Sequence, residues 1–314
     1  MHGWLILDKP LRLGSTQGVS AVKRALRDGG YGKFKVGHGG TLDPLATGVL
    51  PIAIGEATKL AGRMLDSDKI YDFTIRFGVQ TATLDLEGAE IATSDVRPTL
   101  AQLEAVLPRF TGPIDQVPPA YSALKVDGQR AYALARAGED VVLPSRSVTI
   151  HSLSSSPERG GGPPKAVEGL GARASSSGEE LQEITLTAHV SKGTYIRSLA
   201  RDIALALGTV GHVTMLRRVK AGPFTLADSI SLDKLAELGH GRALEDKLLP
   251  LRAGLDDIPA LSLSPDQAGL LRQGRVLIGI AADDGLHFAT SDDVPVALVE
   301  VLDREVSVVR GFNL

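Results

Sequence analysis

The chain has 314 residues, of which 43% are hydrophobic and 23% charged, so it can bury a full core and is long enough for about two domains. It contains no cysteine, which excludes disulfides, thiolate nucleophiles and cysteine-ligated zinc and agrees with a reducing cytoplasm. The formal net charge of -3, from 34 Lys and Arg against 37 Asp and Glu, argues against a general binder of polyanions.

In its N-terminal part the sequence predicts regular elements from hydrophobic periodicity. Val19, Val22 and Leu26 recur at helical spacing, whereas Tyr71 and Phe73 begin a strand in which apolar and polar residues alternate. In chain order we expect a strand at 3–8, a helix at 16–28 ended by Gly29 and Gly30, a strand at 49–54, a short helix at 56–65, a strand at 70–77 and a helix at 100–110.

The middle of the chain is interrupted by a segment rich in Ser, Gly and Pro. Residues 154–180 cannot bury enough apolar surface to offset their ordering entropy, so we expect a flexible insertion at about 154–182. Around it we expect an extended segment at 121–126, a turn at 127–128, a helix at 130–137, an extended segment at 145–153, a strand at 184–190, a helix at 194–207, a strand at 212–219 and a small helix at 232–238.

From about Pro250 the sequence changes to short segments with turns at Gly274 and at 283–285, and it ends in a strand pair, PVALVEVL and EVSVVRGF. This texture predicts a small, mostly β module at 250–314 after a main domain at 1–245. The main domain shows no regular βαβ rhythm. We therefore predict an α+β fold with a mixed, mainly antiparallel central sheet flanked by helices.

No segment predicts a membrane span or a signal peptide. The N-terminal run lacks a basic region and a small-residue cleavage site, and no later apolar run approaches the roughly 20 residues of a membrane helix. The seven histidines form no HExxH-type pair. We expect a soluble cytoplasmic protein without a metal site.

The most informative loop, at 37–59, reads GHGGTLDPLATGVLPIAIGEATK. Asp43 precedes Pro44, whose ring biases it toward an extended conformation, so its carboxylate is expected on a rigid loop. A fixed carboxylate suits nucleophilic attack on an electrophilic carbon or general-base catalysis. The alternative is an ordinary turn aspartate, and the local pattern alone favours that alternative.

Basic residues gather in two segments of the chain. Such patches could hold a nucleic acid through its phosphates, although solvated helix faces are the alternative. The two groups are Lys23, Arg24, Arg27, Lys33 and Lys35, and Lys192, Arg197, Arg201, Arg217, Arg218 and Lys220.

A set of motifs in fixed order makes the chain resemble the bacterial tRNA pseudouridine-55 synthases of the TruB type. The set comprises Asp8-Lys9-Pro10, the loop at 37–59, Asp68-Lys69 with Tyr71, a Thr-x-Thr-x-Asp-x-x-Gly segment at 81–88, QVPPAYSALKVDG at 116–128, SKGTYIRSLARDIALALG at 191–208 and LRRVKAGPF at 216–224. The resemblance covers nearly all of residues 3–225. It implies the pseudouridine synthase fold and, more weakly, a PUA-like RNA-binding module at 250–314.

The resemblance further implies that a uridine of the tRNA T-loop is flipped out and isomerised without a cofactor. Asp43 would be the catalytic carboxylate. Whether it bonds to C1′ of the ribose or promotes elimination to a glycal stays open. We expect a monomer that binds tRNA and requires neither a membrane nor a protein partner.

Other site residues are carried over from the matching motifs. Tyr71 would stack on the flipped base and assist proton transfer, and Arg197 would pair with Asp43. The remaining expected contacts are His38, Tyr195 and Leu216 with the substrate and Lys9, Lys23, Arg24 and Lys192 with RNA. Without the resemblance, the local sequence favours a core position for Tyr71 and a turn position for His38. It likewise favours a solvated helix position for Arg197 and a structural role for Lys9. Thr83 and Asp85 are expected to shape a loop beside the site.

Two departures from the family and two other functions stay open. Arg12 stands where the family often has glycine, and Gly14 where it often has threonine. The insertion after residue 154 is longer than the family's usual connection.

A nucleoside hydrolase would also set a carboxylate against an anomeric carbon. An RNA chaperone or binding module would use the basic groups without chemistry, alone or as a second role.

Overall fold

The computed structural model describes residues 1–126, 128–139, 141–155 and 179–314. These residues form two compact units, and each is described by itself. The first unit comprises Met1–Asp43, Val49–Leu65 and Ala221–Leu314, and the second comprises Pro44–Gly48 and Asp66–Lys220. The residues of the expected C-terminal module therefore belong to the same unit as the N-terminal strand.

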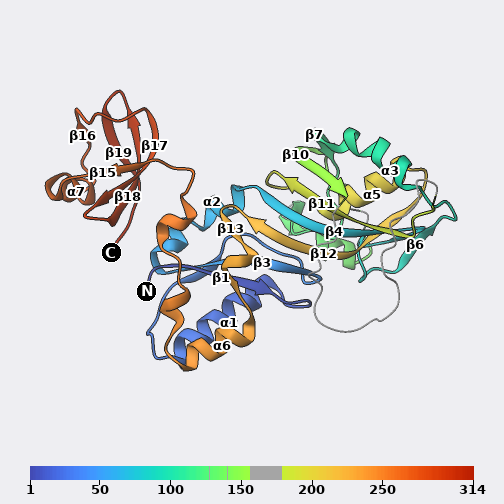
Figure 1. The fold of residues 1–314 in the computed structure, drawn as a ribbon, viewed down its shortest axis with the longest axis horizontal. Helices are drawn as coiled ribbons and strands as arrows, with labels where there is room; N and C mark the ends of the chain where they lie inside the picture. Colours follow the sequence, from blue (N-terminus) through green and yellow to red (C-terminus); the bar gives the residue numbers. More distant parts are fainter. Residues whose placement is uncertain (127, 140, 156–178) are drawn as a thin grey trace. The chain divides into compact units, whose positions relative to one another are not determined.

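The first unit is built on strands β1 (Gly3–Lys9), β2 (Val36–His38), β3 (Ala46–Ile54, which begins in the second unit) and β14 (Ser229–Ile230). Strand β1 pairs in parallel with β14, and β2 pairs antiparallel with β3. The helices α1 (Ser15–Asp28) and α6 (Leu232–His240) lie side by side against these strands (Figure 1). Val19, Val22 and Leu26 are buried there, which confirms the predicted helix and its apolar face.

The C-terminal module has its own five-stranded sheet in the order β15 (Ala260–Ser262), β17 (Gly285–Ser291), β18 (Val294–Leu302), β19 (Glu305–Gly311) and β16 (Leu277–Ile278). The predicted terminal strand pair corresponds to β18 and β19. Helix α7 (Pro265–Arg272) was not predicted from the sequence, although Ser264 caps it by accepting a hydrogen bond from the Gln267 N–H. A cluster that includes Trp4, Phe224, Phe288 and Phe312 joins the module to the rest of the first unit.

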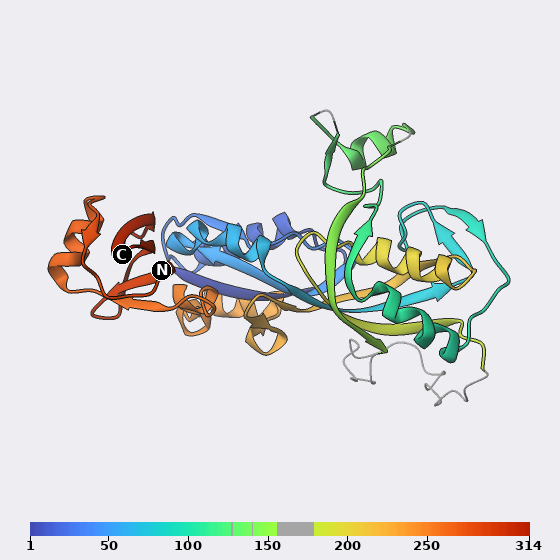
Figure 2. The same ribbon diagram turned by 90° about the horizontal axis from the view of Figure 1, so that it is seen from above.

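The second unit is an open sheet in the order β12 (Gly211–Ala221), β4 (Lys69–Phe77), β11 (Glu183–Val190), β10 (Arg146–Ser155) and β7 (Gly112–Gln116). The pairs from β4 to β7 are all antiparallel, whereas the start of β3 joins β12 in parallel. Helices α3 (Leu100–Val106) and α5 (Ile196–Ala206) pack on this sheet through a core that includes Phe73, Leu103 and Leu199 (Figures 1 and 2). The α+β class and the mainly antiparallel sheet are confirmed.

Several predicted elements differ in detail. The helix expected at 56–65 is a 3-10 helix (Gly55–Lys59) followed by α2 (Ala61–Asp66). The helix expected at 100–110 ends as a 3-10 turn (Leu107–Phe110), where Pro108 cannot donate a backbone hydrogen bond. Of the extended segment at 121–126, only β8 (Lys125–Val126) is a strand.

The remaining elements are short. They are the hairpin of β5 (Val79–Thr81) and β6 (Glu90–Thr93), β9 (Gln129–Arg130), α4 (Ala131–Arg136), β13 (Phe224–Thr225) and 3-10 turns at Leu226–Asp228, Leu244–Lys247 and Leu251–Gly254. Asp127 of the expected turn and residues 156–178 of the expected insertion lie outside the described residues. Within the described part of the chain, every helix is too short or too polar to cross a membrane.

Candidate active site

Asp43 lies half-buried on a loop of the first unit that is anchored on both sides. The buried Ser15 hydroxyl accepts a hydrogen bond from the Leu42 N–H (2.8 Å) and donates one to the Leu42 carbonyl (3.0 Å). Earlier in the loop, the Gly39 N–H donates to the Pro51 carbonyl (2.8 Å). The backbone beside Asp43 is therefore held by buried contacts, as a fixed catalytic carboxylate requires.

The glycines of this loop allow close packing. A Cβ atom on Gly39 would lie 2.6 Å from the Met64 Cβ, and Gly40 has a φ of 131° that disfavours other residues. His38 is half-buried at the end of β2, where its backbone pairs with Ile52. His38 and Asp43 thus belong to the same short connection in the first unit.

The turn between β1 and α1 contains Arg12 at the position where the family often has glycine. Arg12 has a left-handed backbone with a φ of 67°, which glycine adopts without steric cost. The chain therefore keeps a turn of glycine geometry with a different residue. Lys9 is completely buried, and its Nζ donates to the carbonyls of Leu13 (2.7 Å) and Pro10 (3.1 Å). This arrangement favours the structural alternative for Lys9 over an RNA contact.

In the second unit, Tyr195 is held by reciprocal hydrogen bonds at the start of α5. Its N–H donates to the Gln116 Oε1 (2.8 Å), and the Gln116 Nε2 donates to the Tyr195 carbonyl (3.1 Å). The guanidinium carbon of Arg146 lies 4.7 Å from the centre of the tyrosine ring, a cation–π distance. Gln116 is buried, so it fixes the position at which α5 begins.

Arg197 is a buried anchor of the second unit, so its interpretation as a solvated helix residue is wrong. Only 7% of the residue is exposed. Its Nη1 donates to the Thr83 carbonyl (2.8 Å) and lies 3.4 Å from the Asp85 Oδ2, and its Nη2 donates to the Tyr121 carbonyl (3.1 Å). The expected pairing of Arg197 with Asp43 stays a prediction.

Asp85 is the buried charge partner of Arg197, a role that its sequence motif did not predict. Its Oδ1 accepts hydrogen bonds from the Thr83 hydroxyl (2.5 Å) and the Glu87 N–H (3.0 Å), while its Oδ2 faces Arg197. The Thr-x-Thr-x-Asp motif was the available signal. It indicated a loop, but its charge partner could not be inferred because Arg197 is far away in sequence.

Tyr71 and Leu216 are both partly buried against the core of the second unit. Tyr71 lies on β4 opposite Ala188, and Leu216 lies on β12 opposite Ala46. Tyr71 is therefore neither a fully enclosed core residue nor a free surface residue. Each of the two side chains combines a packed part with an exposed part, which suits contact with an aromatic base.

Lys69, two residues before Tyr71 in the chain, is a buried lysine that was not singled out as a site residue. Burial and the nearby Arg218 lower the pKa of Lys69 to about 8. Its Nζ donates to the Ser67 carbonyl (2.5 Å). Lys69 therefore changes its charge closer to neutral pH than an ordinary lysine does.

The second basic group is not one surface patch. Arg197 and Arg218 are only 7% and 1% exposed, and the Lys192 Nζ lies 3.0 Å from the Asp66 Oδ1. Lys23 and Arg24 are exposed on α1 in the first unit. The simple count of positive charges in the second segment therefore overstates what that segment offers to RNA.

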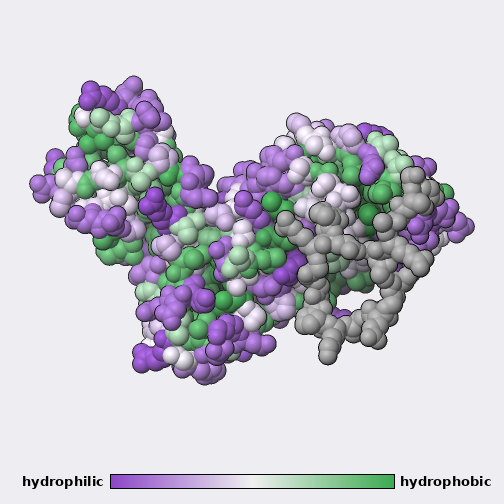
Figure 3. Space-filling model, in the orientation of Figure 1, coloured by the Kyte–Doolittle hydropathy of each residue, from purple (hydrophilic) through white to green (hydrophobic). Residues whose placement is uncertain are grey.

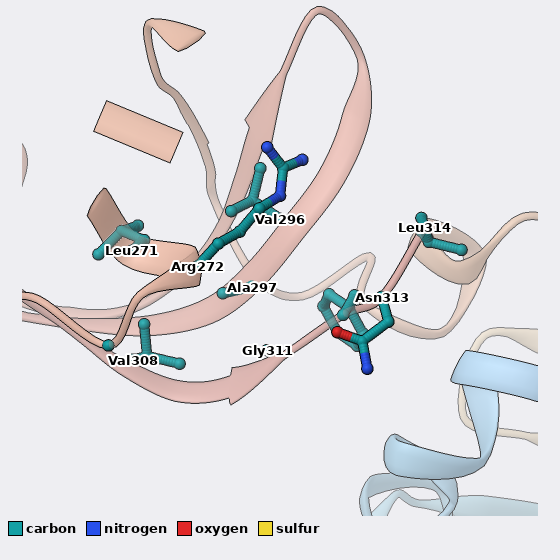
Figure 4. A pocket seen from close by; sticks show the side chains of 10 residues that line it. Leu271, Arg272, Val296, Ala297, Val308, Gly311, Asn313 and Leu314 are labelled. Atoms are coloured by element: carbon teal, nitrogen blue, oxygen red, sulfur yellow. The ribbon is translucent and has the colours of Figure 1, made fainter. Parts of the chain in front are cut away.

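The C-terminal module contains a cavity of about 570 Å³ between α7 and strands β18 and β19 (Figure 4). Leu271 and Arg272 from the helix and Val296, Val308 and Phe312 from the sheet region line it. Polar side chains cover much of the visible surface of the module (Figure 3). None of the site residues expected from the motifs lines this cavity.

Comparisons with known proteins identify the family of the chain. Residues 27–196 match the model of the TruB family pseudouridylate synthase N-terminal domain, and residues 197–256 match that of the tRNA pseudouridylate synthase B C-terminal domain. The chain is 65% identical to tRNA pseudouridine synthase B of Novosphingobium aromaticivorans, covering 100% of this chain and 98% of the relative. It is 55% identical to the protein of the same name from Zymomonas mobilis, covering 100% and 96%.

The fold resembles a chain in the crystal structure of the archaeal box H/ACA sRNP Nop10-Cbf5 complex. The TM-score is 0.69 at 22% identity, covering 99% of this chain and 86% of that chain. This likeness concerns the fold, whereas the family follows from the sequence matches along the whole chain. The chain belongs to the TruB family of pseudouridylate synthases.

Proposed function

We propose that this pseudouridine synthase acts on tRNA and isomerises the uridine at position 55 of the T-loop, with Asp43 as its catalytic carboxylate. The observation that carries the proposal is the anchored Asp43 loop, held by Ser15 in a chain whose full-length relatives are named tRNA pseudouridine synthase B. An ordinary turn aspartate does not need buried hydrogen bonds that hold the backbone of its neighbouring residue.

The reaction explains why a carboxylate is needed. The C1′–N1 bond of the uridine breaks, the detached uracil rotates, and a C1′–C5 bond forms. N1 gains a proton and C5 loses one, so the product is an isomer and nothing is oxidised. A carboxylate beside C1′ stabilises or traps the electron-poor sugar carbon, as carboxylates do in glycosidases. In this proposal Asp43 has that role.

The other site residues would hold the flipped base. Tyr71 and Leu216 provide half-buried surfaces for stacking, and Tyr195 and Arg197 are fixed at the start of α5. Asp43 stands only three residues before Ala46, whose backbone pairs with Leu216 in β12. Asp85 would keep the Arg197 guanidinium oriented.

Binding of tRNA would use exposed basic residues together with the C-terminal module. Lys23 and Arg24 on α1 are exposed, as is Lys192. The module at 250–314 would act as a PUA-like RNA-binding element. We further propose that the enzyme needs no cofactor, because uridine isomerisation involves no redox step, and that it works as a cytoplasmic monomer.

The test compares wild-type protein with Asp43→Asn on an unmodified tRNA transcript, followed by chemical mapping of pseudouridine. The matched control is Asp28→Asn, which changes an exposed aspartate at the end of α1 in the same unit. We expect modification at position 55 by the wild type and the control. Asp43→Asn should form no product, although it should still bind tRNA.

Three results would contradict the proposal. They are full activity of Asp43→Asn, pseudouridine at another position only, and release of free uracil instead of isomerisation. The last result would point to a nucleoside hydrolase.

A further inference from the structure

A cluster of metal-ligating groups lies in the second unit, apart from the residues used in the proposed reaction. The Nε2 atoms of His151 and His189 lie 3.1 Å and 3.7 Å from the Asp68 Oδ2. One ligand atom from each of the three residues lies within 4.8 Å of the other two. Two imidazoles thus converge on one carboxylate oxygen.

A β-bulge produces this convergence. Between β10 and β11 the register passes from Ile150 opposite Val190 to Ser152 opposite His189. His151 is therefore the extra residue, and such residues are turned away from the regular alternation of a strand. The two imidazole rings are 4.7 Å apart at their centres and tilted by 46°.

The third ligand immediately precedes the neighbouring strand. Asp68 lies directly before Lys69, the first residue of β4, which pairs with Val190 in β11. Asp68 therefore lies close to His189 of β11. His151 and His189 lie on the paired strands β10 and β11, so their backbones are held in place, and Asp68 is tied to the same sheet through β4.

The donor chemistry of the cluster suits a cation. Neutral imidazole nitrogens and ionised carboxylate oxygens are common metal ligands in proteins. A metal ion would be shared by both imidazoles and the carboxylate.

We propose that Asp68, His151 and His189 form a binding site for a divalent transition-metal ion of the zinc type. Two imidazole nitrogens and one carboxylate oxygen are a common donor set for zinc, with water completing the coordination at bond lengths of about 2.0–2.2 Å. Side-chain rotations that move the ligand atoms by about 1 Å would bring these atoms to the spacing of a tetrahedral site. The exposed positions of Asp68 and His151 permit this movement.

The site would connect β10, β11 and the start of β4 on one side of the sheet. It would act as a clip that stabilises the second unit. The proposal does not depend on the catalytic role of Asp43, because none of the three ligands takes part in the proposed chemistry.

The test is a titration of the full chain, without a histidine tag, with Zn²⁺ by calorimetry and with Co²⁺ by visible absorption at pH 7.5. We expect saturable binding of one ion and a rise in Tm with Zn²⁺. His151→Ala, His189→Ala and Asp68→Asn should each weaken binding by about tenfold or more. His240→Ala, which removes an exposed histidine from α6, should bind as the wild type does.

Circular dichroism and pseudouridine formation verify that each variant is folded. Binding should also weaken at pH 5.5, where protons compete for the imidazoles. The proposal would be overturned by the absence of saturable Zn²⁺ binding. It would also be overturned if His151→Ala and His189→Ala bound Zn²⁺ as strongly as the wild type. Without saturable Zn²⁺ binding, the three residues would form only an ion pair between the histidines and Asp68.

Discussion

Asp43 owes its fixed backbone to a serine that is distant in sequence. Ser15 begins α1, yet its hydroxyl satisfies both the N–H and the carbonyl of Leu42. Buried backbone groups that lose such partners cost free energy, because water cannot replace the lost hydrogen bonds. Ser15 is thus a positioning residue for the loop that carries the proposed catalytic aspartate.

Replacing Ser15 tests this role. Ser15→Ala leaves two buried polar groups of Leu42 unsatisfied, at a cost of about 1–3 kcal/mol. We expect kcat for pseudouridine formation to fall by about tenfold, because small displacements of a catalytic group are costly. Ser20→Ala is the control, since the Ser20 hydroxyl is exposed and donates only to the Thr16 carbonyl of α1. Equal kcat values for the two variants would contradict the prediction.

The buried Lys69 makes the stability of the protein depend on pH. Its pKa of about 8 in the folded chain is below the ordinary value of 10.5. Between these values the unfolded chain keeps a proton that the folded chain has released. The free energy of unfolding therefore gains a contribution that rises with pH from about 8 to 10.5.

Urea denaturation of wild type and Lys69→Met at pH 8, 9 and 10 measures this contribution. The stability of the wild type relative to Lys69→Met should rise across the series. Lys125→Met, at an exposed lysine of β8, should show no such trend relative to wild type. A constant difference between wild type and Lys69→Met would show that Lys69 keeps an ordinary pKa.

At the scale of elements, the turn between β5 and β6 determines where Arg197 of α5 lies. The Thr81 hydroxyl donates to the Asp85 carbonyl (2.6 Å), and Asp85 faces the arginine. Gly88 lets the turn close, because a Cβ atom there would lie 2.5 Å from the Thr83 nitrogen. A short turn without catalytic groups thus supports a residue of the proposed site.

Gly88→Ala should therefore disturb the turn and the pair of Asp85 with Arg197. We expect a loss of about 1–3 kcal/mol in the free energy of unfolding, as overpacking usually causes, together with reduced pseudouridine formation. Gly62→Ala is the matched control, because no heavy atom lies within 4 Å of the added Cβ atom there. Chemical denaturation measures both variants. Equal stabilities would show that the turn can relax.

At the scale of the whole molecule, the charge balance predicts how tRNA binding responds to salt. The net charge is -3, so attraction to RNA must come from local groups of exposed basic residues. Phosphate contacts release counterions, and the logarithm of the binding constant then falls linearly with the logarithm of salt concentration. Exposed and buried basic residues should therefore differ in their effect.

We expect the double variant Lys23→Gln and Arg24→Gln to weaken tRNA binding and to reduce the salt slope by about two, one for each phosphate contact. Lys234→Gln on α6 is the control, because Lys234 is exposed but paired with Glu237. Filter binding over a series of NaCl concentrations measures the slopes. An unchanged slope in the double variant would exclude these two residues as phosphate contacts.

The sequence predicted most elements whose signal is local. The strands at 3–8 and 70–77 and the helix at 16–28 follow from periodicity, and the structure confirms them. Short elements such as β5, β6 and β7 were missed, because they are stabilised by partners distant in the chain rather than by their own pattern. The capped helix α7 was missed despite a recognisable capping signal.

By itself, the sequence determined the family and the candidate catalytic residue, because the motifs around Asp43 occur in a fixed order along most of the chain. Only the tertiary structure showed that Arg197 is buried beside Asp85, that Ser15 holds the backbone next to Asp43, and that a bulge brings His151 to His189. The physical reason is that each of these contacts joins segments far apart in sequence. Their distances depend on strand register and packing, and no local pattern encodes them.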